Sequence, residues 1–347
     1  MSEEAPITGI YRPMTRTNNT ITGDNSLAFA ASIEGRCPLC HSNETQLVEQ
    51  LPAQQLADSY RRVFGYNPIN EFADTRMIDY RHCDECDLRF FHPALAGAES
   101  LYDVLRMHLG ANYYMQTKPE YDIAQPWITR GQTVLDIGCG VGAFAASVPE
   151  SRYTGLELNS GALAAARRLR RNVINETIEA HSLKHPGQYD VVCSFQVLEH
   201  VCDIRGFLAG CLRALTPSGL LIVCVPSFDS YLRFQTNALL NLPPHHLSHW
   251  SDRCLRQIAE TFPLRLEALE HELLADVHRD SYAATLVSTI FGGHQRLLNT
   301  SRANRFLTRV YWKLGKVLSK ALQAEPMRPR GHSVVASYRK LGEVDDI

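Results

Sequence analysis

The chain has 347 residues, 45% of them hydrophobic and 21% charged, with a formal net charge of −2. That length suits one large domain with a small one, and the absence of a basic excess argues against nucleic acid as a partner. The N-terminus is polar and acidic rather than a secretory signal, and no apolar run approaches membrane-spanning length. We therefore expect a cytoplasmic protein.

Residues 1–30 lack hydrophobic periodicity and are rich in Thr and Asn, so we expect a flexible arm there. A small module over 31–95 follows, with two CxxC pairs formed by Cys37, Cys40, Cys83 and Cys86. In a cytoplasmic chain two such pairs favour a metal site over disulfides. Four thiolates make a closed shell typical of structural Zn²⁺.

Two features of this module depart from a compact zinc ribbon. The gap between the pairs is long, and His41 and Asp87 stand where glycine is usual. Unliganded thiols or a redox pair are the alternatives. The hydrophobic periodicity of 53–64 predicts a helix within the gap.

Residues 96–347 form the predicted large domain. Helices are expected near 97–107 and 117–128, on either side of Tyr113 and Tyr114. An apolar strand at 133–137 then leads into the turn Gly138-Cys139-Gly140-Val141-Gly142, and a second strand ends near Glu157. Glycines allow a close approach of backbone to ligand, so this spacing suits a nucleoside with Glu157 on its ribose.

Asp136, beside the turn, distinguishes between two nucleoside ligands. The glycine pattern also fits a dinucleotide-binding turn, but a carboxylate repels a diphosphate and attracts an ammonium group. The run from Asp136 to Gly142, together with Glu157, resembles the cofactor signature of class I S-adenosylmethionine (SAM)-dependent methyltransferases. The resemblance implies that SAM contacts a set of loop and strand-end residues: Asp136, Gly138, Cys139, Gly140, Gly142, Glu157, Leu158, Thr177, Ile178, Gln196 and Val197.

The later strands and helices alternate as a doubly wound sheet requires. Strands are expected at 173–175, 189–194 and 220–225, from Leu264 onward, and at 331–340. The fold class is therefore α/β, and the resemblance implies a Rossmann-like seven-stranded sheet with an antiparallel last strand.

Leu88-Arg-Phe-Phe, after the second CxxC pair, is expected to be an aromatic strand. The order of CxxC pairs, this strand and the Tyr-Tyr segment is similar to that of bacterial methyltransferases with an amino-terminal zinc-binding module. Many of those act on sugars or other secondary metabolites, which implies a small-molecule or glycan-type acceptor and a role in polysaccharide biosynthesis. The resemblance also implies that Tyr113 or Tyr114 folds over the cofactor; packing at the domain junction is the alternative.

Histidines supply the candidate catalytic residues. His245 and His246 follow the fifth strand, where the chain crosses above the cofactor, and His200 lies in a Leu-Glu-His-Val run typical of the family. Ordinary histidines titrate near neutral pH, so His246 is our candidate base. Hydrogen bonding to the backbone is the alternative role for such loop histidines, and starting the next helix is the alternative for Glu199 and His200.

A helical insertion is expected over 275–329. Its basic residues Arg302, Arg305, Arg309, Lys313, Lys316 and Lys320 fall within about 80° of helical arc, with apolar residues opposite. A solvated basic face is one interpretation. The other is an anionic partner: a nucleotide- or lipid-linked acceptor, or the inner face of a membrane.

The sequence thus predicts methyl transfer from SAM to oxygen or carbon of a small-molecule or glycan-type acceptor. The Asn/Asp-Pro-Pro-aromatic motif of many base N-methyltransferases is absent, with Ser194-Phe-Gln-Val in its place. An RNA or protein methyltransferase and a non-catalytic SAM-binding scaffold are the alternative functions.

Overall fold

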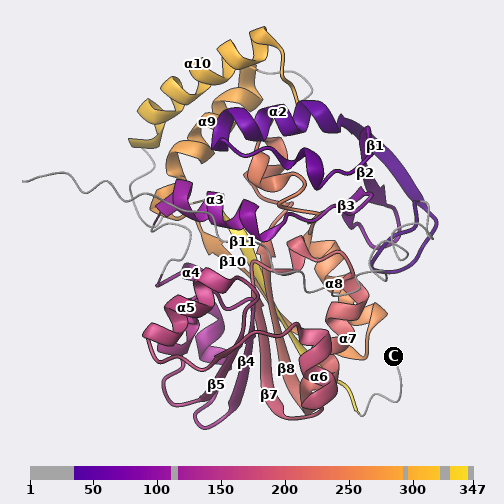
Figure 1. Ribbon diagram of the computed structural model, residues 1–347, viewed down its shortest axis with the longest axis vertical. Coiled ribbons are helices and arrows are strands. Elements are labelled where there is room, and N and C mark those ends of the chain that lie inside the picture. Colours follow the sequence, from indigo (N-terminus) through magenta and orange to yellow (C-terminus); the bar gives the residue numbers. More distant parts are fainter. Residues whose placement is uncertain (1–34, 111–115, 292–295, 321–328, 343–347) are drawn as a thin grey trace, which may run out of the picture. The chain divides into compact units, whose positions relative to one another are not determined.

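The computed structural model describes residues 35–110, 116–291, 296–320 and 329–342 (Figure 1). Its strands are β1 (Thr45–Pro52), β2 (Met77–Cys83), β3 (Arg89–His92), β4 (Thr133–Ile137), β5 (Arg152–Leu156), β6 (Val173–Ile174), β7 (Tyr189–Phe195), β8 (Leu215–Pro226), β9 (Ser248–His249), β10 (Leu264–Leu273) and β11 (Arg330–Lys340). Its α-helices are α2 (Ala53–Phe64), α3 (Glu99–Leu109), α4 (Pro119–Ala124), α5 (Ser160–Arg168), α6 (Ile178–Lys184), α7 (Ile204–Ala214), α8 (Asp252–Thr261), α9 (Arg279–Phe291) and α10 (Arg302–Leu318).

Seven of these strands form one sheet, in the order β10-β11-β8-β7-β4-β5-β6. The strands from β8 to β6 are parallel, whereas β11 lies antiparallel between β10 and β8. The predicted Rossmann-like sheet with an antiparallel last strand is therefore confirmed. The order reverses beside β4, and such a switch point is where ligands bind in open parallel sheets.

Both faces of this sheet are covered by helices, which is why its central strands β4 and β7 are mostly apolar. Alternate residues of β4 and β7 enter two separate cores, one containing Leu135 and Val192 and the other Val134 and Val191. The first core includes residues of α6, α7 and α8; the second includes α4, the 3-10 helix Ala143–Ala146 and a flanking residue of α5 (Figure 1). This arrangement is the doubly wound fold expected from the sequence.

A second, four-stranded sheet has the order β1-β2-β3-β9. Its first three strands come from the cysteine-containing module, but β9 belongs to the segment that follows β8. The backbone N–H of Phe91 donates to Leu247 O at 3.0 Å, and that of Gly97 to Pro244 O at 2.8 Å. The buried hydroxyl of Tyr60 donates to Leu239 O at 2.6 Å. The module therefore holds the backbone of the 239–250 segment in place.

The predicted helix at 53–64 is confirmed by α2, but the strands β1 and β2 on either side of it were not expected. The helix expected over 117–128 is shorter, since α4 ends at Ala124 and a 3-10 turn continues over Gln125–Trp127. Pro126 lies in that turn and has no N–H to donate to an α-helical bond. Within the described residues, no helix is both long and apolar enough to cross a membrane.

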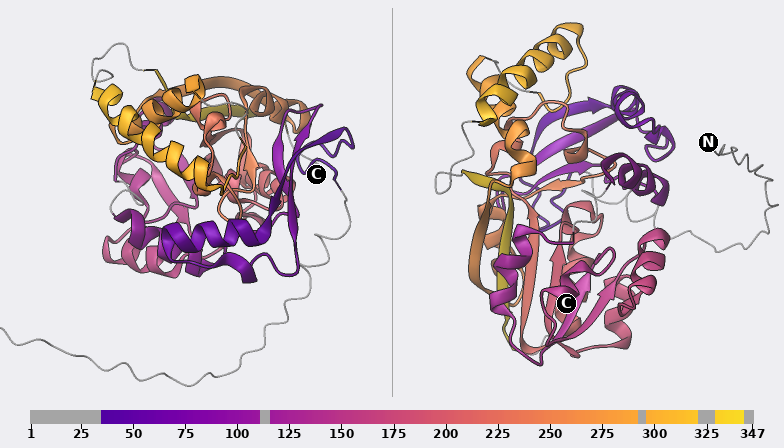
Figure 2. Two further views of the ribbon diagram at one scale, coloured as in Figure 1. Left: turned by 90° about the horizontal axis from the view of Figure 1, so that it is seen from above. Right: turned by 90° about the vertical axis from the view of Figure 1, so that its left-hand side faces the viewer.

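The chain between β10 and β11, where a helical insertion was expected, forms two helices, α9 and α10 (Figure 2). They run antiparallel: Ser319 Oγ donates to Asp280 Oδ1 at 2.6 Å, and Gly315 lies against Ala284. A Cβ at position 315 would come within 2.5 Å of the Ala284 nitrogen. Glycine is therefore what allows the two helices to approach so closely.

Candidate active site

A cavity of about 1000 Å³ opens at the carboxyl ends of the parallel strands. It is lined by most of the residues predicted to bind the cofactor: Asp136, Gly138, Cys139, Gly140, Glu157, Leu158, Thr177, Ile178, Gln196 and Val197. It is also lined by the three candidate catalytic residues, His200, His245 and His246. Gly142 belongs to the turn but does not line the cavity, and Tyr113 and Tyr114 lie outside the described residues.

The turn after β4 requires its glycines. Gly138, Gly140 and Gly142 have φ values of 63°, 57° and 73°, a region that L side chains rarely adopt. At Gly138 a Cβ would also come within 2.4 Å of Val197 Cγ2. The residues that follow β7 therefore pack directly on the turn.

Two acidic side chains fix the polar end of this turn. Asp136 is buried and accepts a hydrogen bond from the Tyr153 hydroxyl at 2.7 Å. Burial raises the pKa of Asp136 to about 7, although Tyr153 and Lys118 both favour its charged form. Glu157 accepts from the backbone N–H groups of Gly140, Leu158 and Asn159 at 2.7–2.8 Å. The Glu157 carboxylate thus ties the end of β5 to the glycine turn.

The other predicted cofactor residues have definite structural roles as well. Gln196 has a φ of 60°, and its amide donates to Ser333 Oγ at 3.1 Å. Thr177 accepts from Ala180 N and so caps α6, whose first residue Ile178 is buried. These side chains reach the cavity from beyond the carboxyl ends of two strands, β7 and β6, which is where open parallel sheets bind ligands.

The three candidate catalytic histidines form one cluster. Their ring centroids lie 4.6–4.8 Å apart. Because a carbonyl only accepts, Nδ1 of His200 must donate to His245 O at 2.5 Å, and Nδ1 of His245 to Leu240 O at 2.8 Å. The backbone contacts weighed as an alternative are thus present, and they orient rings that also line the cavity.

Burial keeps these imidazoles uncharged. It lowers the pKa of His200 to about 4 and that of His245 to about 3, and it holds the pKa of His246 well below its usual range. An unaided base with so low a pKa accepts a proton poorly at neutral pH. The general-base role predicted for His246 therefore has electrostatics against it in this environment.

Glu199 lies between two of these rings. Its Oε1 is 3.8 Å from His200 Nε2 and 3.9 Å from His246 Nε2. Neither Glu199 oxygen, nor Nδ1 of His246, has a hydrogen-bond partner among the described residues. Burial raises the pKa of Glu199 to about 8.

Several cavity residues were missed from the sequence: Lys118, Glu120, Glu272, His278 and His332. Glu272 on β10 accepts the backbone N–H groups of His332 and Ser333, and its Oε1 lies 2.7 Å from His332 Nδ1. The pairing of β10 with β11 brings Glu272 and His332 together, and no local sequence motif predicts that contact.

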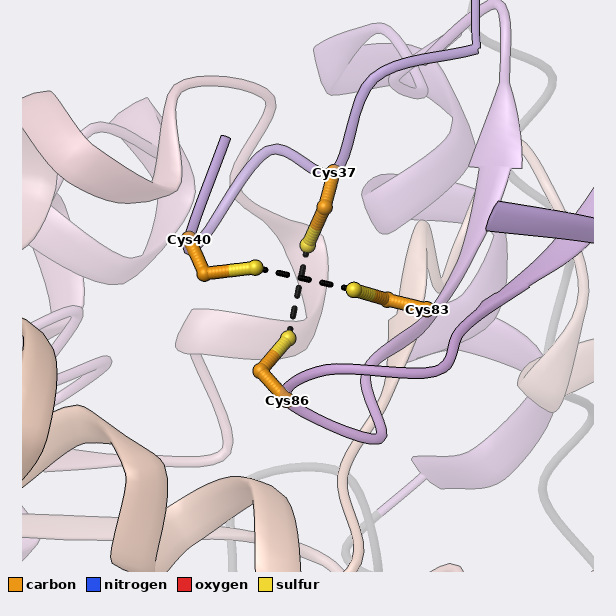
Figure 3. A group of neighbouring side chains, drawn as sticks. All are labelled: Cys37, Cys40, Cys83 and Cys86. Carbon is orange, nitrogen blue, oxygen red and sulfur yellow. Dashed lines mark hydrogen bonds between the residues drawn. The ribbon is translucent and has the colours of Figure 1, made fainter. Parts of the chain in front are cut away.

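The four module cysteines converge on one point (Figure 3). Their ligand atoms all lie within 4.8 Å of one another, with Cys37 Sγ 3.4 Å from Cys86 Sγ and Cys40 Sγ 3.5 Å from Cys83 Sγ. His41 and Asp87 take positive φ values of 61° and 65°, and their N–H groups donate to Cys37 O and Cys83 O. Both pairs therefore form the same tight turn despite lacking the usual glycine.

Comparison with known proteins gives matches centred on the large sheet. Residues 111–269 match the family model described as a methyltransferase domain. Ubiquinone biosynthesis O-methyltransferases from Klebsiella pneumoniae subsp. pneumoniae and Sodalis glossinidius are 38% and 39% identical over 97 residues, which is 26% of this chain and 40% and 39% of theirs. The alignment thus spans about two fifths of the length of these relatives.

Among solved structures, a SAM-dependent methyltransferase from Archaeoglobus fulgidus aligns with a TM-score of 0.44 and 16% identity, over 69% of this chain and 99% of the other. The family match, the strand order and the glycine turn together define the class of protein. The chain contains a class I SAM-dependent methyltransferase domain.

Replacing Gly138 by alanine should weaken cofactor binding by more than about tenfold, because the turn must both keep a left-handed residue and avoid Val197. Isothermal titration of SAM measures the effect. Gly187→Ala is the matched control, since Gly187 has a φ of 62° but has no atom near its Cβ position. Both variants should lose about 1–2 kcal/mol of stability. Equal SAM affinity in the two variants would contradict the prediction.

Proposed function

We propose that this protein transfers a methyl group from SAM to a hydroxyl oxygen of a small-molecule acceptor. The charge of the cavity supports SAM as its cofactor. Among the described residues that line it, eight are carboxylates (Glu99, Glu120, Asp136, Glu157, Glu176, Glu179, Glu199 and Glu272) and Lys118 is the only Lys or Arg. Such a cavity favours a cation and disfavours a diphosphate. SAM carries a sulfonium and an ammonium group.

The residues present fit this cofactor. The buried Asp136 carboxylate receives one hydrogen bond from Tyr153 and gains from a neighbouring cation. Glu157 already holds the glycine turn, and its remaining lone pairs are suited to ribose hydroxyls. When bound, SAM supplies an electrophilic methyl group on a good leaving group. The protein's contribution is then chiefly to position the acceptor oxygen in line with that methyl group.

The acceptor is proposed from different observations. A cavity of about 1000 Å³ is at the upper end for a single ligand, so it has room for an acceptor beside the cofactor. The relatives named as O-methyltransferases support oxygen as the accepting atom. Their names give no support to the sugar-type acceptor or the role in polysaccharide biosynthesis that the sequence resemblance implied.

SAM should bind the purified protein, and NADH should not. SAM affinity should rise as the pH increases through about 7 and then level off, because only ionised Asp136 attracts the cation. Asp136→Asn should weaken SAM binding about tenfold and flatten this pH dependence, while the control Asp58→Asn, at a half-buried residue that does not line the cavity, should change neither. Calorimetry between pH 6 and pH 8.5 provides the measurement. Tight NADH binding with no response to SAM would overturn the proposed function.

The accepting molecule can be sought with methyl-labelled SAM. A native small-molecule extract incubated with the protein should yield one labelled product, and mass spectrometry of its fragments identifies the methylated atom. The Gly138→Ala variant serves as the inactive control. Label on protein or RNA would favour a macromolecular acceptor instead.

We also propose that the four module cysteines bind a structural Zn²⁺. Four converging sulfurs from two matching turns suit tetrahedral zinc and leave no position for a substrate. Three of the four side chains are fully buried in the core that also contains Trp250 and residues of α7 and α8. Zinc in this position would stabilise the second sheet and, through β9, the segment that carries His245 and His246.

The purified protein should contain a single zinc ion per chain by elemental mass spectrometry. Cys37→Ser should lose it and lower the thermal unfolding temperature, because three remaining thiolates bind zinc less tightly. Cys202→Ser, at an exposed cysteine outside the cluster, should keep both zinc and stability. The zinc proposal fails if the native protein carries no metal, or if the two variants behave alike.

A third proposal concerns α10, which has three distinct faces. Asn304, Thr308, Tyr311, Gly315 and Ser319 form the packed face and are buried or half-buried. The basic face consists of the exposed Arg302, Arg309, Lys313, Lys316 and Lys320, whereas Arg305 is half-buried and donates to Thr300 O. The third face is apolar and largely exposed; Phe306 is 64% and Val317 71% accessible.

An apolar face bordered by basic residues fits the surface of an anionic bilayer. Such helices lie in the membrane interface with their apolar side chains among the acyl chains and their cations at the headgroups. The end of α9 adds exposed apolar surface, because Ile290 and Phe291 are 73% and 71% accessible. We therefore assign α10 to peripheral binding of anionic lipid.

The protein should co-sediment with vesicles that contain phosphatidylglycerol and not with vesicles of phosphatidylcholine alone. Val317→Asp and the double change Arg309→Glu with Lys313→Glu should each reduce the bound fraction at least about fivefold, since each removes one of the two attractions. Leu183→Asp, at an exposed leucine of α6, is the matched control. Unchanged vesicle binding, or a dimer in sedimentation that Val317→Asp dissociates, would reject the lipid assignment.

A further inference from the structure

The cluster of Glu199, His200, His245 and His246 has the composition of a metal site, separate from the four cysteines. One ring nitrogen from each histidine lies within 4.8 Å of the others. The Glu199 carboxylate lies 3.8–3.9 Å from Nε2 of both His200 and His246. Imidazole and carboxylate together are the ligands that divalent first-row transition metals prefer.

Ring orientation and the distances to Glu199 together select three of the four residues as ligands. A metal binds an imidazole in the ring plane, along the nitrogen lone pair. The rings of His245 and His246 are nearly parallel, at 17°, and 4.7 Å apart, so they do not direct lone pairs at one point. Both rings are steeply inclined to that of His200, by 75° and 78°, and His246 is the one whose Nε2 lies 3.9 Å from Glu199.

His245 has a different role in the cluster. Its backbone carbonyl accepts from His200 Nδ1 at 2.5 Å, which fixes the His200 tautomer and leaves the Nε2 lone pair facing Glu199. Metal-binding histidines almost always donate their second nitrogen in this way to a carbonyl or carboxylate. His245 itself donates through Nδ1 to Leu240 O, so its own ring is held in turn.

The carboxyl group of Glu199 has no hydrogen-bond partner that would stabilise its negative charge among the described residues. Glu199 is buried, and neither of its oxygens has a hydrogen-bond partner among the described residues. A buried carboxylate without such partners costs free energy that a bound cation would offset.

We propose that Glu199, His200 and His246 bind a divalent transition-metal ion that holds the acceptor's hydroxyl group. Adjacent ligands of such an ion, with bonds of ~2.1 Å, lie ~3.0–3.4 Å apart, so binding draws Glu199 and the two rings together by about 0.5 Å. Three protein ligands leave open positions. These suit an acceptor that presents two neighbouring oxygens, such as a catechol or a vicinal diol.

This inference rests on the proposed methyl transfer and adds to it the source of the activated oxygen. Coordination lowers the pKa of the acceptor hydroxyl, and its proton passes to solvent water. The oxygen then forms the bond to the methyl carbon while the carbon–sulfur bond breaks. Its electron pair stays on sulfur, so the sulfonium becomes a neutral thioether. The role of His246 changes from proton acceptor to metal ligand.

Mn²⁺ is the most useful probe, because thiolates bind it weakly and its solution electron paramagnetic resonance signal disappears on binding. The zinc-loaded full chain should bind a single Mn²⁺. Glu199→Gln and His246→Gln should each weaken this binding more than about tenfold. His278→Ala should leave it unchanged, since His278 lines the same cavity but lies outside the cluster.

Circular dichroism and SAM titration of the same samples separate the possible failures. Glutamine is close in size to both residues replaced, so both variants should stay folded, and His246→Gln should keep the SAM affinity of the parent protein. If the parent protein binds no Mn²⁺, or if both glutamine variants bind it as tightly as the parent, the metal site does not exist. Loss of SAM binding by the parent protein, with Mn²⁺ still bound, would instead remove the proposed function and leave the metal site standing.

Discussion

The 239–250 segment is held by backbone hydrogen bonds to the cysteine-containing module, and the candidate active site depends on that attachment. Phe91 of that module and Gly97, just beyond its end, donate to carbonyls on either side of His245 and His246. On the other side, Leu247 N donates to Glu199 O at 2.7 Å, which joins the segment to the end of β7. The histidine cluster is thus assembled from two parts of the chain. The second sheet, with the cysteine cluster buried beside it, fixes their spacing.

The shifted pKa values in the cavity are caused by the burial of its acidic and histidine side chains. Asp136, Glu157 and Glu199 have raised pKa values because they lie away from water, and the histidines have lowered ones for the same reason. The result is a group of acids that ionise less readily than usual and a group of bases that are not charged. Both proposed ligands, a sulfonium cofactor and a divalent metal, supply positive charge at those points. One physical property therefore underlies two separate proposals.

Patterns of neighbouring residues were enough to predict those helices, strands and turns that depend on nearby residues alone. The apolar strand before Gly138 and the periodicity of 53–64 specify a buried strand and a helix without help from the rest of the chain. The positive φ of the three turn glycines follows from their residue type. In contrast, His41 and Asp87 adopt the same left-handed conformation without glycine. Tertiary packing holds Asp87 there, through hydrogen bonds from His82 and Ser251.

Contacts between residues far apart in the sequence could not be predicted from such patterns. Glu199 is adjacent to His200 in sequence, but its approach to His246 depends on where the module places the 239–250 segment. Glu272 and His332 meet only because β10 pairs with β11 across the whole insertion. Sequence periodicity also gave α10 two faces, one basic and one apolar. The third face, formed by small and polar residues around Gly315, became visible only when α9 was seen to pack there. Because that packed face uses few apolar side chains, the apolar face of α10 is left exposed.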